Sequence, residues 1–395
     1  LQLVHCHPGS QLSDIRAIKD AVGELAHMYA ALHQLGAGLR YIDIGGGLGV
    51  DYEGSGQDLP RSLNYSLAEY ASAVVYRIAA VCDHAGIEHP VILSESGRAL
   101  SAYCSVLVVN ALGNLRFEDR EPLALPAEDE PLPQPLADLV TAWWDLDGDR
   151  PVEVFHDAEQ AYQQAMQLFT VGLLGLEQRA LAERLFWAIC TRLRDRYGEG
   201  EELPAAVADL PAALSDIYFC NFSVFQSLPD FWAIDQLFPI MPIHRLDEAP
   251  TRSATLADIT CDSDGKVDRF ALPGGPSPLL PVHPLRDDEP YYLGAFLIGA
   301  YQETLGDLHN LFGDTHVVTI HPEADGGWSI DEMVRGDTAS ELLGYMQFST
   351  ESLRPRIWRD CERAVRDGRL TLAESQALRR FYEEELESYA YLDLP

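Results

Sequence analysis

The stretch YIDIGGGLGV, residues 41–50, decides how the rest of the chain is interpreted. Its first four residues, Tyr41 to Ile44, have the character of a β-strand, and three glycines follow at once. Successive glycines carry no Cβ, so their backbone N–H groups can approach a ligand closely and form an anion-binding nest. Phosphate is the natural occupant of such a nest. A simple tight turn would have the same sequence, so the neighbouring motifs must decide between the two interpretations.

Strand and helix patterns alternate around this stretch. Residues 1–7 alternate like a strand, and apolar residues then recur at helical spacing from Leu12 to Leu35, with Ser13 or Asp14 as the expected cap. A second helix is predicted over 66–86 and a third strand over 90–98. This order is typical of a βα-barrel or a doubly wound sheet, whose sites lie at the carboxyl ends of the strands. The side chains and glycines at those ends are His7, Ser10, Gly45, Gly46, Gly47, Glu95 and Arg98.

Three βα units do not close a barrel. The chain also opens inside an apolar strand and does not begin with Met. We therefore expect it to be the C-terminal part of a longer protein, whose preceding segment supplies the other strands.

The character of the sequence changes three times after the third strand. Residues 118–136 are rich in Pro and acidic residues and indicate a linker, helical patterns follow, and strand signals return from 216. The strand spacing favours an antiparallel sandwich or a small barrel. The predicted fold class is α/β plus β, in four segments: the C-terminal part of a TIM-type βα-barrel (1–118), a helical insertion (119–212), a β-sandwich domain (213–335) and a C-terminal helical region (336–395).

Composition limits the possible partners. The 395 residues include 62 acidic and 28 basic side chains, for a net charge of −34. This charge argues against nucleic acid or an anionic membrane as a partner and is compatible with a cationic substrate. Seven scattered cysteines without a CxxC pair indicate a reducing, cytoplasmic location. No apolar run has the length of a membrane span.

Several polar residues have both a chemical and a structural interpretation. His5 and His7 share a strand face, but no third metal ligand is evident nearby, so a zinc site is disfavoured and any metal ligands stay unknown. Glu95 can keep a ring nitrogen protonated and Arg98 can clamp a phosphate, although a structural ion pair explains both equally well.

The β-rich half of the chain contains further candidates. In DITCDSDG, Cys261 is a candidate proton donor and Asp262 a candidate anion for a cationic substrate; the alternative is an acidic turn. Tyr301 offers a phenol to a phosphate or is a core tyrosine. Asp230 and Asp235 lie among apolar residues, where a carboxylate suits a guanidinium or ammonium partner or caps a helix.

Six motifs taken together resemble one family, the biosynthetic arginine decarboxylases, which are pyridoxal-phosphate enzymes of the alanine racemase and ornithine decarboxylase fold type. They are HCHPGSQ, DIGGGLGVDYEG, ESGR, NFSVFQSLPDFWAIDQLFP, DITCDSDG and GAYQETLGDLHNLFGD, and they span essentially the whole chain. The resemblance implies decarboxylation of arginine to agmatine in polyamine biosynthesis. It also implies a cofactor-binding barrel, a β-sandwich that completes the site, and a cytoplasmic homo-oligomer (dimer or tetramer). Magnesium is common in the family, and no local ligand cluster indicates it here.

The resemblance assigns a role to each motif. His7 is expected to stack on the pyridoxal ring, Glu95 to pair with its nitrogen, and Cys261 to protonate Cα after CO₂ leaves. The phosphate is expected to contact Ser10, the three glycines 45–47, Arg98 and Tyr301. Asp262, with Asp230 or Asp235, is expected to bind the guanidinium. The family's substrate loop matches Ile42, Asp43, Ile44, Gly45, Gly46, Gly47, Leu48, Gly49, Val50, Asp51 and Tyr52. In relatives, the residues that correspond to Cys261 and Asp262 reach into the partner subunit's site, and the resemblance implies the same here.

One required residue is not found. The chemistry begins from a Schiff base on a lysine, and the two lysines of the chain, Lys19 and Lys266, are predicted on a helix and after an acidic turn. We expect the catalytic lysine in the segment upstream of residue 1 and no activity from this chain alone. The alternatives are another basic substrate (ornithine, lysine or diaminopimelate) and a non-catalytic paralogue or subunit.

Overall fold

The computed structural model describes residues 1–59, 61–116, 125, 131–197 and 204–392 and divides into two compact units. The first unit contains Leu1–Gly113, Tyr218–Thr251 and Leu256–Pro395, and the second contains Asn114–Ile217 and Arg252–Thr255. Most of the predicted linker 118–136 lies outside the described residues, as does Gly198, the expected end of the last insertion helix.

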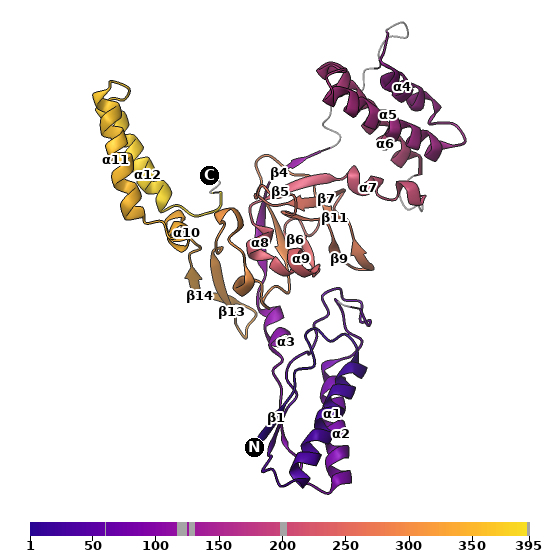
Figure 1. The fold of residues 1–395 in the computed structure, drawn as a ribbon, viewed down its shortest axis with the longest axis vertical. Coiled ribbons are helices and arrows are strands. Elements are labelled where there is room, and N and C mark those ends of the chain that lie inside the picture. The colour runs from indigo at the N-terminus through magenta and orange to yellow at the C-terminus, as the bar shows by residue number, and fades with distance from the viewer. Residues whose placement is uncertain (60, 117–124, 126–130, 198–203, 393–395) are drawn as a thin grey trace. The chain divides into compact units, whose positions relative to one another are not determined.

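The first unit opens with two βα units and a third strand, as the sequence predicts. β1 (Leu3–His5), β2 (Tyr41–Asp43) and β3 (Val91–Leu93) form a three-stranded parallel sheet in that order. The helices α1 (Ile15–Gln34) and α2 (Leu67–Ala85) connect the strands and lie side by side (Figure 1). Parallel neighbours joined by helices are the repeating unit of βα-barrels and doubly wound folds, so this part of the predicted fold class is confirmed.

Local sequence signals set the limits of both helices. The Asp14 carboxylate accepts the Arg16 N–H at the start of α1, and the Ser66 hydroxyl accepts the Glu69 N–H at the start of α2. Gly86, with φ of 66°, ends α2 in the left-handed conformation that glycine adopts easily. The apolar stripe predicted for α1 is buried against the sheet and α2; its members include Ile15, Ile18, Val22, Leu25 and Tyr29. Leu35 is an exception, because α1 ends at Gln34 and this side chain is exposed.

A second, larger sheet is built from strands between residues 107 and 295. Its hydrogen-bonded order is β11–β7–β5–β4–β12–β6, with β8 paired to β7. The strands are β4 (Leu107–Leu115), β5 (Asp216–Cys220), β6 (Ile240–Pro242), β7 (Arg252–Ala257), β8 (Lys266–Val267), β11 (Leu280–Val282) and β12 (Tyr291–Ala295). β12 pairs antiparallel with both β4 and β6, and the end strands β6 and β11 approach each other. The sheet is therefore a nearly closed small barrel, one of the two predicted arrangements, and β4 comes from the segment 1–118.

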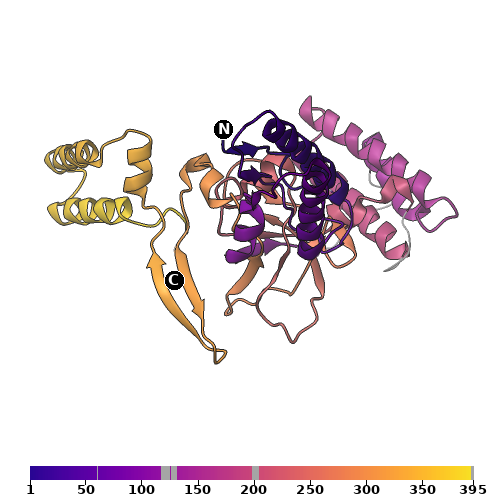
Figure 2. The same ribbon diagram turned by 90° about the horizontal axis from the view of Figure 1, so that it is seen from below.

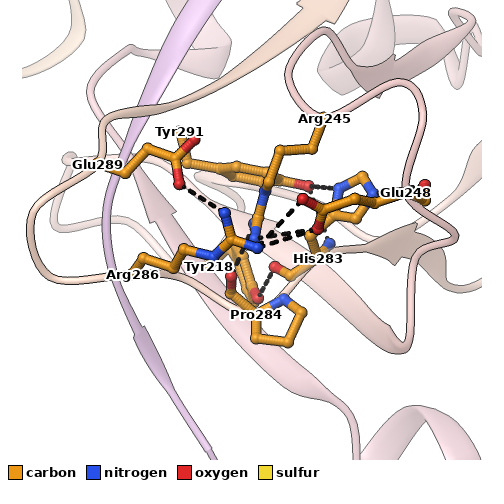
Figure 3. Close-up of polar contacts among 8 residues, drawn as sticks. All are labelled: Tyr218, Arg245, Glu248, His283, Pro284, Arg286, Glu289 and Tyr291. Atoms are coloured by element: carbon orange, nitrogen blue, oxygen red, sulfur yellow. Dashed lines mark hydrogen bonds and ion pairs between the residues drawn. The ribbon is translucent and has the colours of Figure 1, made fainter.

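A polar network ties together the loops at one end of this sheet. Figure 3 shows its eight residues: Tyr218, Arg245, Glu248, His283, Pro284, Arg286, Glu289 and Tyr291. The Arg245 guanidinium lies 5.2 Å from the centre of the Tyr291 ring and donates to the Pro284 carbonyl at 2.7 Å. The Arg286 guanidinium bridges Glu248 and Glu289. These contacts join two loops, the one after β6 and the one between β11 and β12, so the network fixes the geometry of the barrel end.

Two hairpins and three helices complete the first unit. β9 (Phe270–Leu272) pairs with β10 (Gly275–Ser277), and β13 (Val317–Pro322) pairs with β14 (Trp328–Val334), drawn in orange in Figure 2. The C-terminal helices are α10 (Ala339–Tyr345), α11 (Thr350–Arg366) and α12 (Leu372–Leu386), and α11 and α12 pack together. Thr338 with Glu341 and Thr371 with Glu374 form capping boxes at α10 and α12, which explains where these two helices begin.

The second unit is a helical bundle. α4 (Gln134–Asp145), α5 (Pro151–Thr170) and α6 (Leu176–Tyr197) pack against one another (Figure 1). Apolar side chains from all three helices form its core, among them Leu139, Ala158, Leu185, Ile189 and Leu193. The described part of the chain contains no helix that is long and apolar enough to cross a membrane.

Candidate active site

The glycine turn after β2 is packed so tightly that side chains are excluded. A Cβ on Gly45 would lie 2.2 Å from the Cys6 carbonyl oxygen, and one on Gly46 would lie 2.8 Å from that of Glu95. Gly45 and Gly47 also have φ of 66° and 104°. The turn therefore needs glycine for both space and backbone conformation, and it brings the ends of β1, β2 and β3 together.

Two glycine N–H groups in this turn have protein acceptors. The Gly45 N–H donates to the Asp43 carboxylate at 2.9 Å, and the Gly46 N–H donates to His7 Nδ1 at 3.2 Å. These bonds hold the exposed His7 ring directly beside the turn. Ser10 is also exposed, in the connection between β1 and α1. The structure thus brings His7 and the glycines together as predicted.

A carboxylate–imidazole group lies at the same edge of the sheet. The Asp43 carboxylate is buried and contacts His5 Nδ1 at 2.8 Å. The ligand atoms of His5, Asp43 and Glu95 all lie within 4.8 Å of one another. Asp43 was assigned to the substrate loop by resemblance; here its contacts are internal, to His5 and Gly45, so it holds the turn in shape.

Arg98 lies between two tyrosines that come from different parts of the chain. Its Nη1 donates to the Tyr52 hydroxyl at 2.9 Å, and its Cζ lies 4.9 Å from the centre of the Tyr301 ring. Arg98 Nε is buried and has no hydrogen-bond partner among the described residues. Burial raises the pKa of Tyr52 and the neighbouring Arg98 opposes this effect. The predicted phosphate residues Arg98 and Tyr301 are therefore adjacent, and the buried Nε–H is available to a ligand.

The remaining predicted substrate-loop residues are mainly packing and turn-forming residues. Ile42, Ile44 and Val50 are buried, and the Val50 N–H donates to the Gln11 side chain at 2.9 Å. The Gly49 N–H donates to the Tyr65 hydroxyl, and Leu48 forms a parallel bridge with Leu12. Asp51 accepts from the Gly54 and Gly56 N–H groups and from the Ser62 hydroxyl. This loop is therefore held by hydrogen bonds to neighbouring segments and ends at the buried Tyr52.

Asp230 and Asp235 have partners within the chain. Asp230, in the short helix α9 (Pro229–Ile234), is 7% exposed and accepts from Gln302 Nε2 at 2.8 Å, while its N–H donates to Gln302 Oε1. Asp235 ends this helix with φ of 59° and pairs with Arg269 at 2.5 Å. The Arg269 guanidinium lowers the pKa of Asp235. Neither carboxylate caps the helix: that of Asp230 binds the Gln302 amide, and that of Asp235 binds a guanidinium of the chain itself, Arg269.

The proposed proton donor Cys261 is exposed in the turn after β7. Its N–H donates to Asn310 Oδ1 at 3.1 Å, and its Sγ lies 3.5 Å from Asn310 Nδ2. The neighbouring Asp262 carboxylate lies 4.0 Å from His309 Nε2. His309 and Asn310 lie in one of the six family motifs, but neither residue was predicted to act in the site.

The two lysines occupy surface ion pairs. Lys19 Nζ, on α1, lies 3.9 Å from the Glu69 carboxylate, and Lys266 Nζ, on β8, lies 2.9 Å from the Asp268 carboxylate. Both are therefore placed as the sequence predicts, on a helix and beyond an acidic turn.

Comparisons with known proteins agree with this arrangement. Residues 1–102 match the pyridoxal-dependent decarboxylase, pyridoxal binding domain family. Residues 129–210 match the arginine decarboxylase helical bundle domain, and residues 339–392 match the arginine decarboxylase C-terminal helical extension. The chain belongs to the pyridoxal-dependent decarboxylases.

Within that class its relatives are biosynthetic arginine decarboxylases. The chain is 46% identical to the one from Rhodopirellula baltica and 47% identical to the one from Thermosynechococcus vestitus, over 99% of its own length and 63% and 61% of theirs. Its structure matches that of the biosynthetic arginine decarboxylase SpeA from Campylobacter jejuni with a TM-score of 0.84 at 29% identity, covering 100% of this chain and 64% of that one. The resemblance and the fold class are therefore confirmed, and the chain spans about three fifths of the length of these relatives.

Proposed function

We propose that the full-length protein is a pyridoxal-phosphate-dependent decarboxylase that converts L-arginine to agmatine and CO₂. The observation that carries the proposal is the 46% identity to a biosynthetic arginine decarboxylase along 99% of this chain. Arginine is favoured over ornithine, lysine and diaminopimelate because the helical bundle and the C-terminal extension match families named for arginine decarboxylase.

The residues of the site fit the cofactor. A Cβ on Gly46 would lie 3.1 Å from His7 Cε1, so the glycine keeps the backbone open beside an exposed aromatic ring. The buried Nε of Arg98, in the short helix α3 (Gly97–Ser101) that follows β3, is an unused donor, which suits a phosphate. We therefore assign the ring to His7 and Glu95, and the phosphate to Ser10, Gly45, Gly46, Gly47, Arg98 and Tyr301.

Bound pyridoxal phosphate supplies an electron sink for the pair of electrons that remains at Cα when CO₂ departs. Glu95 would keep a proton on the ring nitrogen, which strengthens that sink. His7 would fix the orientation of the ring through its flat imidazole. The Cys261 thiol would then donate its proton to Cα, and the thiolate would regain a proton from solvent.

Two carboxylates are proposed to recognise the guanidinium of arginine: that of Asp262 and that of either Asp230 or Asp235. Asp262 Oδ1 accepts only a backbone N–H, that of Asp264, whereas Asp230 is bonded to the Gln302 amide and Asp235 to the Arg269 guanidinium. A guanidinium offers several N–H donors in one plane and so favours a carboxylate with free oxygen positions.

We further propose a cytoplasmic homo-oligomer, in which Cys261 and Asp262 serve the partner subunit's site. The seven free cysteines support a reducing compartment.

Magnesium is not assigned a site. Among the described residues, the group His5, Asp43 and Glu95 has suitable atoms, but Glu95 is assigned to the cofactor and an imidazole is a poor magnesium ligand.

The deciding experiment measures agmatine and CO₂ formation by the full-length protein with added pyridoxal phosphate. Arginine, ornithine, lysine and diaminopimelate are compared as substrates. A higher kcat/KM for any other amino acid would refute the choice of arginine, and inactivity on all four would favour a non-catalytic paralogue.

Replacing Asp230, Asp235 and Asp262 separately with Asn tests recognition of the guanidinium. An unchanged KM for arginine in all three variants would exclude these carboxylates as its partners.

A further inference from the structure

The segment 306–313, GDLHNLFG, contains two successive non-glycine residues in the left-handed conformation. Asn310 has φ of 55° and Leu311 has φ of 58°. A leucine in this region is strained, and such strain persists only where the surrounding structure enforces it. The segment is anchored at Gly306, where a Cβ would lie 2.6 Å from the Gln226 carbonyl oxygen, and at Asp307, whose N–H donates to the Phe225 carbonyl at 3.0 Å.

The strained turn brings the Asn310 side chain into hydrogen-bonding contact with Cys261. Asn310 Oδ1 accepts the Cys261 N–H at 3.1 Å, and Nδ2 lies 3.5 Å from the Cys261 sulfur. The two contacts define one orientation of the amide, because the backbone N–H requires an oxygen acceptor. Consequently the NH₂ group must face the sulfur.

His309, which precedes Asn310, lies close to Asp262, which follows Cys261. His309 Nε2 lies 4.0 Å from the Asp262 carboxylate, and its ring lies 4.5 Å from that of Phe225 at an angle of 45°. Neighbouring residues of the strained turn thus face neighbouring residues of the turn after β7: Asn310 is hydrogen-bonded to Cys261, and His309 lies 4.0 Å from Asp262.

We propose that Asn310 and His309 are positioning residues for the proton donor and for the substrate carboxylate, respectively. This inference rests on the proposed function of Cys261 and Asp262. An N–H donor that faces the sulfur stabilises the negative charge left there when the thiol gives its proton to Cα. It also holds the sulfur in one orientation, so that the proton is delivered from a fixed point. His309 orients Asp262 and leaves the thiol untouched.

The first test measures the thiol itself and needs no turnover. The full-length protein is treated with iodoacetamide, and alkylation of Cys261 is followed by peptide mass spectrometry. The exposed Cys104 in the same sample is the internal reference. In Asn310→Asp the side chain still accepts the Cys261 N–H, but it loses the donor and adds a negative charge beside the sulfur. Because the thiolate is the reacting form, alkylation of Cys261 should slow at least about threefold while Cys104 is unchanged.

A purely structural role predicts a different result, since Asn310→Asp retains the backbone contact. An alkylation rate of Cys261 equal to that of the wild type would overturn the proposal. The matched control is Asn221→Asp, because Asn221 makes a similar pair of contacts, donating to the Leu392 carbonyl at 2.8 Å and accepting its N–H at 3.1 Å. If Asn221→Asp slowed the alkylation of Cys261 equally, the effect would reflect a general loss of stability, and the proposal would also fail.

The second test separates the two residues kinetically. Asn310→Gly keeps the left-handed backbone and removes both contacts, so kcat for arginine should fall about tenfold with KM within about twofold. His309→Gln should raise KM at least about threefold with little change in kcat. The opposite assignment, with Asn310→Gly acting only on KM, would refute the proposal. Absence of arginine decarboxylation by the wild type would refute the proposed function instead, and the alkylation result would still decide the Asn310 contact.

Discussion

The Arg98 guanidinium donates a hydrogen bond to the Tyr52 hydroxyl at 2.9 Å. This contact joins the end of the glycine-rich loop to the short helix α3 (Gly97–Ser101), which follows β3. Tyr52 is 1% exposed and also packs edge-on against Phe238, so its hydroxyl is a fixed acceptor. The guanidinium therefore reaches the site in a defined orientation before any ligand binds.

Removal of this acceptor should weaken both stability and cofactor binding. In Tyr52→Phe the free energy of unfolding should fall by about 1–2 kcal/mol, because a buried hydrogen bond to a charged group is lost. The affinity of the full-length protein for pyridoxal phosphate should fall several-fold, as followed by absorbance titration. The control is Tyr345→Phe, which removes a hydrogen bond to Asp337 on an exposed tyrosine. Equal cofactor affinity in wild type and Tyr52→Phe would contradict the role given to Arg98.

The glycine turn can be tested by comparing two glycines with similar backbone angles. Gly45 and Gly54 have φ of 66° and 70°, but a Cβ meets the Cys6 carbonyl oxygen at 2.2 Å only at Gly45 and meets nothing within 4 Å at Gly54. Gly54→Ala should lower the free energy of unfolding by about 1 kcal/mol through backbone strain alone. Gly45→Ala should cost about 2 kcal/mol more because of the clash. Urea unfolding measures both, and equal losses would show that close approach at Gly45 is unimportant.

The sequence predicted those features that depend on local periodicity. The helices α1 and α2 and the three parallel strands follow from the spacing of apolar residues between Leu3 and Leu93, and their packing into one core agrees. β14 was not predicted, since WSIDEMV lacks a strand-like alternation that faces a core, and its residues are largely exposed.

Contacts between distant segments could not be predicted in the same way. Asp230 and Gln302 are 72 residues apart, and nothing near either residue indicates the other. The same holds for Cys261 and Asn310, whose pairing depends on two turns that meet only in the folded chain. Family motifs located these residues, whereas only the structure shows what each one contacts.

Alkaline pH should destabilise the protein through buried thiols. Burial raises the pKa of Cys220 from 9.0 to about 12. Below pH 9 both the native and the unfolded chain keep this proton, so it adds no pH dependence. Between pH 9 and about 12 the unfolded chain releases the proton and the native chain retains it, so the free energy of unfolding falls with pH.

The thiol of Cys220 should account for about 1.4 kcal/mol per pH unit in this interval. Cys220→Ala should remove that part of the slope of unfolding free energy against pH, whereas Cys104→Ala, at an exposed cysteine, should leave it unchanged. Denaturant titrations at several alkaline pH values measure the slopes. An identical slope in wild type and Cys220→Ala would show that this thiol ionises equally in both states.

The network at the end of the β barrel predicts a strong coupling between His283 and Tyr291. His283 is 3% exposed, and its Nδ1 lies 2.9 Å from the Tyr291 hydroxyl while its Nε2 lies 3.0 Å from the Glu248 carbonyl oxygen (Figure 3). The His283 backbone N–H donates to the same hydroxyl at 2.9 Å. These contacts are all satisfied by a neutral imidazole that carries its proton on Nε2 and accepts the tyrosine proton at Nδ1.

His283→Leu should therefore lower the free energy of unfolding by about 2–3 kcal/mol, since it leaves a buried hydroxyl proton and a buried carbonyl without their partners. Tyr291→Phe should cost a similar amount. In the double variant the orphaned hydroxyl no longer exists, so its loss should be smaller than the sum of the single losses by about 1 kcal/mol or more. Urea unfolding of the four proteins gives this coupling, and strictly additive losses would show that the imidazole and the phenol act independently.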